Sequence, residues 1–149
     1  MKKYKLTTAT KTLKGNTMYQ IQALKSFRDV IAGDLGGWVE SEDNLSQLGD
    51  CWVSEGARVS GHAIVSGHAI VSGYASVYGN AKVYGKAKVS GYASVYGNAS
   101  VYGNASVLGN AMVSGNARVS GHAIVSRDAK VFEDAWQSEY TWVSEYASV

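Results

Sequence analysis

Proline is absent from this sequence of 149 residues, and cysteine occurs once, as Cys51. A single cysteine excludes an intrachain disulfide and a cysteine-based metal cluster, so we expect Cys51 to be a small buried core residue. No apolar run reaches the length of about 18 residues that a membrane-spanning helix needs. The first residues, MKKYKLTTATK, are basic, but no apolar stretch follows them as it would in a secretory signal. These features fit a cytoplasmic protein with no membrane partner.

Acidic residues are missing from the middle of the chain. Residues 56–127 contain no Asp or Glu, although they carry six Lys or Arg residues and all three histidines. A zone of one charge sign favours anionic partners. Nucleic acid is disfavoured as the partner, because these basic residues are few and their spacing provides no groove-reading element.

What the sequence has in abundance is glycine, with 17 residues spread largely at a fixed period. Valine recurs at every sixth position from Val53 to Val131 and returns at Val143 and Val149, while Gln137 breaks the series. A small residue, nearly always Ala, precedes each valine by two positions, and residues two apart in a strand point to the same side. Ala and Val are therefore predicted to face inward, and glycine to turn each corner. Such a short unit must stack on copies of itself, which predicts a solenoid.

A longer period, equal to three of these units, overlies the period of six. The segment YASVYGNA occurs at 74–81 and again at 92–99, so three sides per turn would place residues three units apart directly above one another. This pattern resembles the hexapeptide-repeat left-handed parallel β-helix family over residues 51–149, in about sixteen units. The resemblance implies an all-β fold of about 5–6 coils with a left-handed turn and a dry interior of Val and Ala. A ligand would then bind outside the prism or between subunits.

The two ends depart from the repeat. Residues 1–50 are predicted to form an N-terminal β cap, with two strands around Gly15-Asn16 and with Trp38 covering the core. The combination YQIQALKSF…AGDLGGWVESEDNLS, followed by hexapeptides, resembles a poorly characterised group of bacterial and phage proteins, many of which are labelled acyltransferases by fold alone. At the other end, either the acids block end-to-end stacking or this end packs against another subunit. These acids are Glu133, Asp134, Glu139 and Glu145.

The search for catalytic chemistry favours a protein that is not an enzyme. Enzymes that this fold resembles carry a histidine on a loop that leaves the coils, whereas no such loop interrupts residues 51–149. His62, His68 and His122 all follow glycine in GHAIVS and are interpreted as corner residues. His68 and His122 would lie three coils apart, roughly 14 Å, too far to share a zinc ion. The central coils also provide no acid to orient a histidine, so neither a metal nor a cofactor is expected.

The outward positions of the middle coils carry a basic and aromatic set. Its members are Lys82, Tyr84, Lys86, Lys88, Tyr102, Arg118 and His122. Aromatic faces stack on bases, and ammonium or guanidinium groups bind phosphate, so this composition is typical of a site for a small anion. Stacked tyrosines also stabilise sheets and subunit contacts, and we expect such columns at Tyr74, Tyr78, Tyr92 and Tyr96.

The resulting prediction is a non-catalytic homotrimer that binds a small anionic ligand of the nucleotide type in grooves between subunits and could act by sequestering it. One alternative is a coenzyme A-dependent acyltransferase with His122 or His68 as the general base. The other alternative is a structural assembly module without a ligand.

Overall fold

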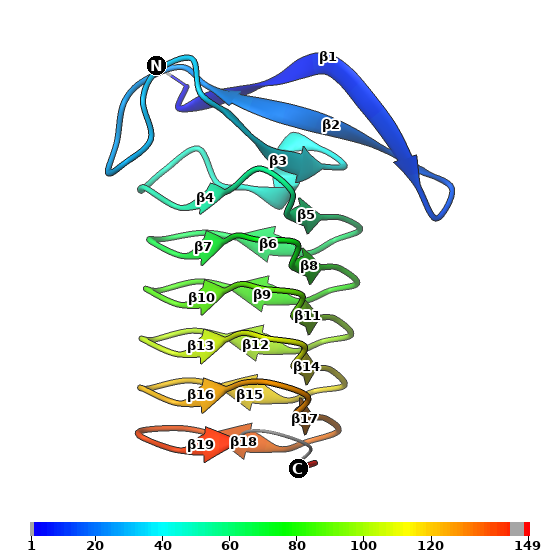
Figure 1. Cartoon of the computed structure of the whole chain (residues 1–149), viewed down its shortest axis with the longest axis vertical. Coiled ribbons are helices and arrows are strands. Elements are labelled where there is room, and N and C mark those ends of the chain that lie inside the picture. Colours follow the sequence, from blue (N-terminus) through cyan, green and yellow to red (C-terminus); the bar gives the residue numbers. More distant parts are fainter. Residues whose placement is uncertain (1, 144–147) are drawn as a thin grey trace.

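The computed structural model describes residues 2–143 and 148–149. The chain forms a three-sided β-solenoid of about six turns beneath an N-terminal β cap (Figure 1). The strands of each side lie in register above one another and make three sheets, which we number 1 to 3. This confirms the predicted all-β parallel β-helix with a hairpin cap. Within the described part of the chain, no helix has the length and apolarity needed to cross a membrane.

Sheet 1 joins the cap to one side of the prism. It contains β1 (Tyr4–Leu13), β2 (Asn16–Ala23), β3 (Leu35–Val39), β5 (Arg58–Val59), β8 (Ser76–Val77), β11 (Ser94–Val95), β14 (Met112–Val113) and β17 (Lys130–Val131). Sheet 2 contains β6 (Ile64–Val65), β9 (Lys82–Val83), β12 (Ser100–Val101), β15 (Arg118–Val119) and β18 (Trp136–Gln137). Sheet 3 contains β4 (Trp52–Val53), β7 (Ile70–Val71), β10 (Lys88–Val89), β13 (Ser106–Val107), β16 (Ile124–Val125) and β19 (Trp142–Val143).

The core follows directly from the repeat. Each short strand of the middle coils pairs in parallel with the strands three repeat units before and after it, so that Val83 lies against Val65 and Val101. The alanines and valines of the middle coils have no exposed surface, which confirms that these two positions face inward. The residue before each valine faces outward, and its side chain is partly or fully exposed in most coils. The repeat therefore fixes the interior and leaves the outward columns free to vary.

The cap is a hairpin that continues sheet 1. Strands β1 and β2 are antiparallel, and the turn residues are Lys14 and Gly15 with φ of 51° and 82°. Two positive φ values are typical of the type I′ turn that suits a two-residue hairpin, so the predicted hairpin is confirmed with its turn one residue earlier. Strand β2 pairs antiparallel with β3, and β3 pairs in parallel with β5. Figure 1 shows the hairpin crossing the top of the prism and projecting past one side of it.

The prediction that Trp38 covers the core is wrong. Trp38 pairs with Arg58 in the outward column of sheet 1 and is only half-buried, because Val39 takes the inward position of β3. The core is covered instead by Tyr4, Ile21 and Leu45, none of which has exposed surface. The Tyr4 hydroxyl donates to the carbonyl of Leu45 at 2.5 Å, which ties the start of the cap to the first coil.

Cys51 is fully buried, as predicted, and lies beside a buried lysine. The Lys3 ammonium donates to the Cys51 carbonyl at 2.7 Å and to the Cys51 sulfur at 3.2 Å. Burial lowers the pKa of Lys3 and raises the pKa of the Cys51 thiol, although each group opposes the shift of the other. The pair closes the top of the solenoid with a polar contact that the sequence pattern does not reveal.

The last described coil differs from those above it. Its corners carry Arg127, Glu133 and Glu139 at positive φ where earlier coils have glycine. Its outward positions carry exposed aromatic rings, namely Phe132, Trp136, Tyr140 and Trp142. Glu145 lies outside the described residues, and the proposed role of the terminal acids in blocking stacking stays a prediction.

Candidate functional site

Four members of the predicted ligand set lie together on sheet 2. The outward column of this sheet runs Ile64, Lys82, Ser100, Arg118, Trp136. At the end of β9 and β12, the rings of Tyr84 and Tyr102 stack with centroids 4.9 Å apart and planes 4° from parallel. Burial and the neighbouring Tyr102 raise the pKa of Tyr84, while the charge of Arg118 opposes this rise. We call Lys82, Tyr84, Tyr102 and Arg118 the flank.

The other three predicted members are not all on this face. Lys86 and His122 lie at the corner between sheets 2 and 3, and the His122 ring stacks on Tyr140 at 4.9 Å. Lys88 belongs to β10 of sheet 3, in register with Ile70 and Ser106. The predicted set is therefore spread around one edge of the prism, because successive units of the repeat turn a corner.

The second set of tyrosines forms two columns, one before and one after the short strands of sheet 1. Tyr74 and Tyr92 stack at 5.4 Å, and Tyr78 and Tyr96 stack at 5.0 Å with planes 2° apart. The predicted stacking of residues three units apart is thus confirmed for all three tyrosine pairs. Tyr74 and Tyr92 are 58% and 66% exposed, so most of this column is open to solvent or to a partner.

One histidine has an acidic partner, contrary to the expectation that no acid orients a histidine. His68 Nδ1 lies 2.5 Å from the Asp50 carboxylate, and Arg28 Nε lies 3.7 Å from the same carboxylate. Burial would raise the pKa of Asp50, but the hydrogen bond with His68 and the charge of Arg28 together lower it. The His68 side chain is 58% exposed, so much of the imidazole ring is open to solvent.

The signal for this pair was present in the sequence, because Asp50 and His68 are separated by three repeat units, which is one full coil. A search of the acid-free segment 56–127 does not reach this acid, because Asp50 lies just before that segment. Beside the pair lies a hollow of about 230 Å³ whose lining includes Arg28, Asp29 and Glu55. Among the residues that the structure describes, no group of three or more His, Cys, Asp or Glu side chains is arranged to hold a metal ion.

These features describe a three-sided β-solenoid that is built from six-residue repeats. A family model described as the YdcK beta solenoid repeat matches residues 57–73. The chain is also similar to a protein of Escherichia coli (strain K12) named "Uncharacterized acetyltransferase YdcK", with 41% identity over an alignment of 58 residues. That alignment takes in 34% of this chain and 18% of the relative, so the chain spans less than a fifth of the curated relative it matches.

Proposed function

We propose that this protein is a non-catalytic, homotrimeric solenoid that binds a small anionic ligand of the nucleotide type on its flank. The observation that supports this most is the Tyr84–Tyr102 stack on the same face as the exposed cations Lys82 and Arg118. Aromatic rings that accept a base, together with cations that accept phosphate, are the usual components of such a site.

The two ends of the Tyr84–Tyr102 stack differ, and this difference indicates where a base would bind. The stack ends at Tyr102, where the next residue of the column is Ser120, whose hydroxyl accepts from Trp136 Nε1 at 3.2 Å. At the Tyr84 end the next residue is also a serine, Ser66, which is half-buried. A planar base is therefore expected to stack on Tyr84 above Ser66, where Lys82 can reach its phosphate.

The trimer belongs to the same proposal. A ligand on one flat face would keep much of its surface in water, whereas a second prism packed along the edge would enclose it. The exposed Tyr74–Tyr92 column supplies the aromatic surface that subunit interfaces favour. A trimer of such prisms would enclose three equivalent grooves.

Native mass spectrometry tests the ligand and the oligomer together. The expected spectrum is a trimer that takes up as many as three molecules of added ADP. Lys82→Ala and Tyr84→Ala should each weaken uptake about tenfold or more, because stacking or a phosphate contact is lost. Lys130→Ala, which removes the same charge from sheet 1, is the matched control and should leave uptake unchanged. A protein that binds no ADP, or binds it equally in all variants, would contradict the proposal.

Acyl transfer is the second candidate, and two observations favour it. Asp50 orients His68 as a general base would be oriented, and the curated relative carries the printed name of an acetyltransferase. The acid-lined hollow beside Arg28 would suit an amine acceptor.

The test measures release of free coenzyme A from acetyl-coenzyme A in the presence of a panel of amines. Under this candidate, His68→Ala abolishes release and Asp50→Asn reduces it, while His122→Ala, at the equivalent corner without a carboxylate partner among the described residues, retains it. Sensitivity to His122→Ala instead would move the base to that residue. Any such turnover would overturn the non-catalytic proposal.

A further inference from the structure

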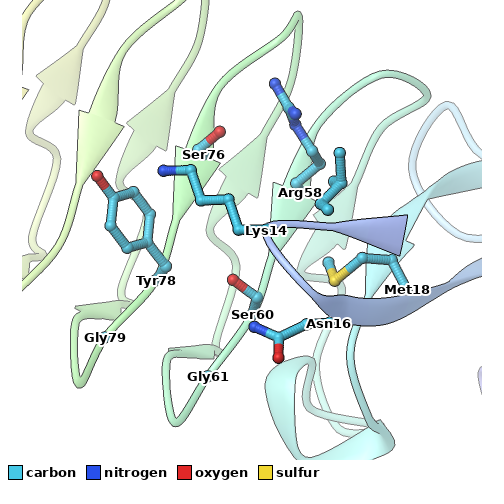
Figure 2. A pocket seen from close by; sticks show the side chains of 10 residues that line it. Lys14, Asn16, Met18, Arg58, Ser60, Gly61, Ser76, Tyr78 and Gly79 are labelled. Atoms are coloured by element: carbon cyan, nitrogen blue, oxygen red, sulfur yellow. The ribbon is translucent and has the colours of Figure 1, made fainter. Parts of the chain in front are cut away.

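The hairpin tip and the outer face of sheet 1 enclose a groove that the repeat does not predict (Figure 2). Leu13, Lys14 and Met18 line it from the hairpin, and Arg58, Ser76 and Tyr78 line it from the coils. Its volume is about 260 Å³. The groove faces a different side of the prism from the flank, so the inference drawn from it is independent of the proposed function.

Positive charge is concentrated at this groove. The Lys14 ammonium lies 5.1 Å from the centroid of the Tyr78 ring, and Arg58 comes from the strand beneath the hairpin. Among the described residues that line the groove, none is acidic. The Arg58 Nε atom is buried and has no hydrogen-bond partner among the described residues. Burying an unpaired guanidinium N–H is unfavourable, so a small shift of the Arg58 side chain toward an acceptor in the groove would gain a hydrogen bond that the unliganded protein lacks.

A third cation, Lys11, lies close to Arg58. The Lys11 ammonium stands 4.3 Å above the Trp38 ring, next to Arg58 in the outward column. Burial lowers the pKa of Lys11, and the nearby charge of Arg58 lowers it further. The two like charges therefore repel each other in the unliganded protein, and a bound anion would relieve that repulsion.

The walls of the groove suit a flat ring. The stack on Tyr96, with centroids 5.0 Å apart, fixes the orientation of the Tyr78 ring. Figure 2 shows Lys14 and Tyr78 on facing sides of the groove, with Met18 at the hairpin end. The volume lies just below the roughly 300–1,000 Å³ of sites for drug-sized ligands. The groove therefore has room for a compact one- or two-ring molecule, whereas an intact dinucleotide or coenzyme A would exceed it.

We propose that this groove binds a small planar anion, with the carboxylate or phosphate group paired to Arg58 and Lys14 and the ring lying in the space between the hairpin and the outer face of sheet 1. The backbone at Lys14 supports a role for this side chain. Lys14 has φ of 51°, a conformation that Gly or Asn adopts with less strain. A strained lysine at the tip is therefore understandable if its charge is needed there.

The experiment is isothermal titration calorimetry of the full chain with three probes that share one ring system: 1-naphthoate, 1-naphthyl phosphate and neutral 1-naphthol. We expect one site per chain for at least one anion, and affinity for 1-naphthol at least about tenfold weaker. Comparison of the two anions distinguishes a carboxylate ligand from a phosphate ligand.

Variants separate the groove from general charge effects. Arg58→Gln should weaken anion binding by about 10- to 100-fold. Lys14→Asn should also weaken it, while the thermal midpoint stays equal or rises because Asn relieves the backbone strain. Lys130→Gln is the matched control, because it removes one charge from the same outward column of sheet 1 away from the groove, and it should change affinity less than twofold. The flank variant Lys82→Ala should likewise leave the groove unaffected.

Three results would overturn the proposal. One is equal affinity for 1-naphthol and 1-naphthoate, since the charge would then play no part. Another is an effect of Arg58→Gln no larger than that of Lys130→Gln. The last is no heat of binding for either anion at concentrations up to about 10 mM.

Discussion

The corner glycines offer a quantitative test of how the coils are held together. Gly103 has φ of 66°, and a Cβ added there would lie 2.9 Å from the amide nitrogen of Gly121 in the next coil. Gly103→Ala therefore combines two costs. The left-handed conformation costs a non-glycine residue about 1–2 kcal/mol. The added Cβ would also push the backbones of the two neighbouring coils apart by a few tenths of an ångström, an overpacking that typically costs about 1–3 kcal/mol.

Gly15→Ala is the matched control that isolates the first cost. Gly15 has φ of 82°, but no atom lies within 4 Å of the position its Cβ would occupy. We therefore expect a loss of about 1–2 kcal/mol in the free energy of unfolding for Gly15→Ala and about 2–5 kcal/mol for Gly103→Ala. The last described coil shows that a side chain can bear the first cost, since Glu133 and Glu139 occupy corners at φ of 56° and 57°.

Urea unfolding followed by far-ultraviolet circular dichroism measures both variants. The comparison requires that the denaturant slope stay the same, because a changed slope would indicate loss of two-state behaviour. If Gly103→Ala cost no more than Gly15→Ala, the close approach of neighbouring coils would not be what requires glycine at the corners. The requirement would then be a matter of backbone angle alone.

Two further predictions concern the core and the acidic pair. Val101→Ala removes buried methyl groups and should lower the free energy of unfolding by about 1–3 kcal/mol. Ser100→Ala, at the outward neighbour, should change it by less than about 0.5 kcal/mol. Urea unfolding of both variants measures the difference, and equal effects would contradict the assignment of Val101 to the core. The lowered pKa of Asp50 means that its ionised form favours the folded state. This stabilisation is present above the unfolded-state pKa of about 3.9 and is lost as pH falls through the lower folded-state value. Thermal midpoints between pH 6 and pH 3 should therefore fall more steeply in the parent protein than in Asp50→Asn, and parallel curves would show that His68 does not stabilise the carboxylate.

The parts of the molecule that obey the period were predictable from the sequence, because a single physical rule governs them. Residues two apart share a side of a strand, and residues three repeat units apart stack. These two statements are enough to place the Val and Ala core and the Tyr84–Tyr102 stack. The same rule contained the Asp50–His68 pair, which was missed only because Asp50 precedes the central coils.

The first coil departs from the period of the repeat, but it does so after Trp38 and not at that residue. Val39 pairs with Val59 and Val53 pairs with Val71, so the separation along the chain is two positions longer in the first pair than in the second. The first coil therefore holds two extra residues, which follow a short 3-10 helix at Glu42–Asn44. The spacing of six between Val39 and Leu45 places Trp38 on the outward side of its strand, so the phase of the repeat predicts its position correctly and the size of its apolar ring does not.

The hairpin groove could not be predicted, because its contacts follow no period. Lys14 and Arg58 are distant in the sequence, and only the path of the hairpin brings them to one groove. A two-residue turn is visible in a sequence, but the surface against which the turn packs is decided by the twist and bulge of the strands that carry it. Strand β1 has such an irregularity between Leu6 and Thr10.

The spacing of charge along the solenoid explains why the two proposed sites should differ in strength. Stacked strands lie roughly 4.8 Å apart, so identical charges on adjacent coils would repel each other. The outward column of sheet 2 avoids this by placing Ser100 between Lys82 and Arg118, which separates the two cations by roughly 10 Å. The flank can thus offer two separated contacts but cannot concentrate charge on one group.

The hairpin removes that limit, because its residues are not bound by the stacking period. It brings Lys11 and Lys14 over a face that already carries Arg58, and the partial burial of Lys11 and Arg58 reduces the screening of their charges by water. One compact anion in the groove can therefore interact with several cations at once, whereas on the flank it meets them singly. Anion affinity should accordingly be higher in the groove and fall more steeply with salt concentration than on the flank. Equal salt dependence at the two sites would mean that the hairpin lysines do not act on the bound ligand.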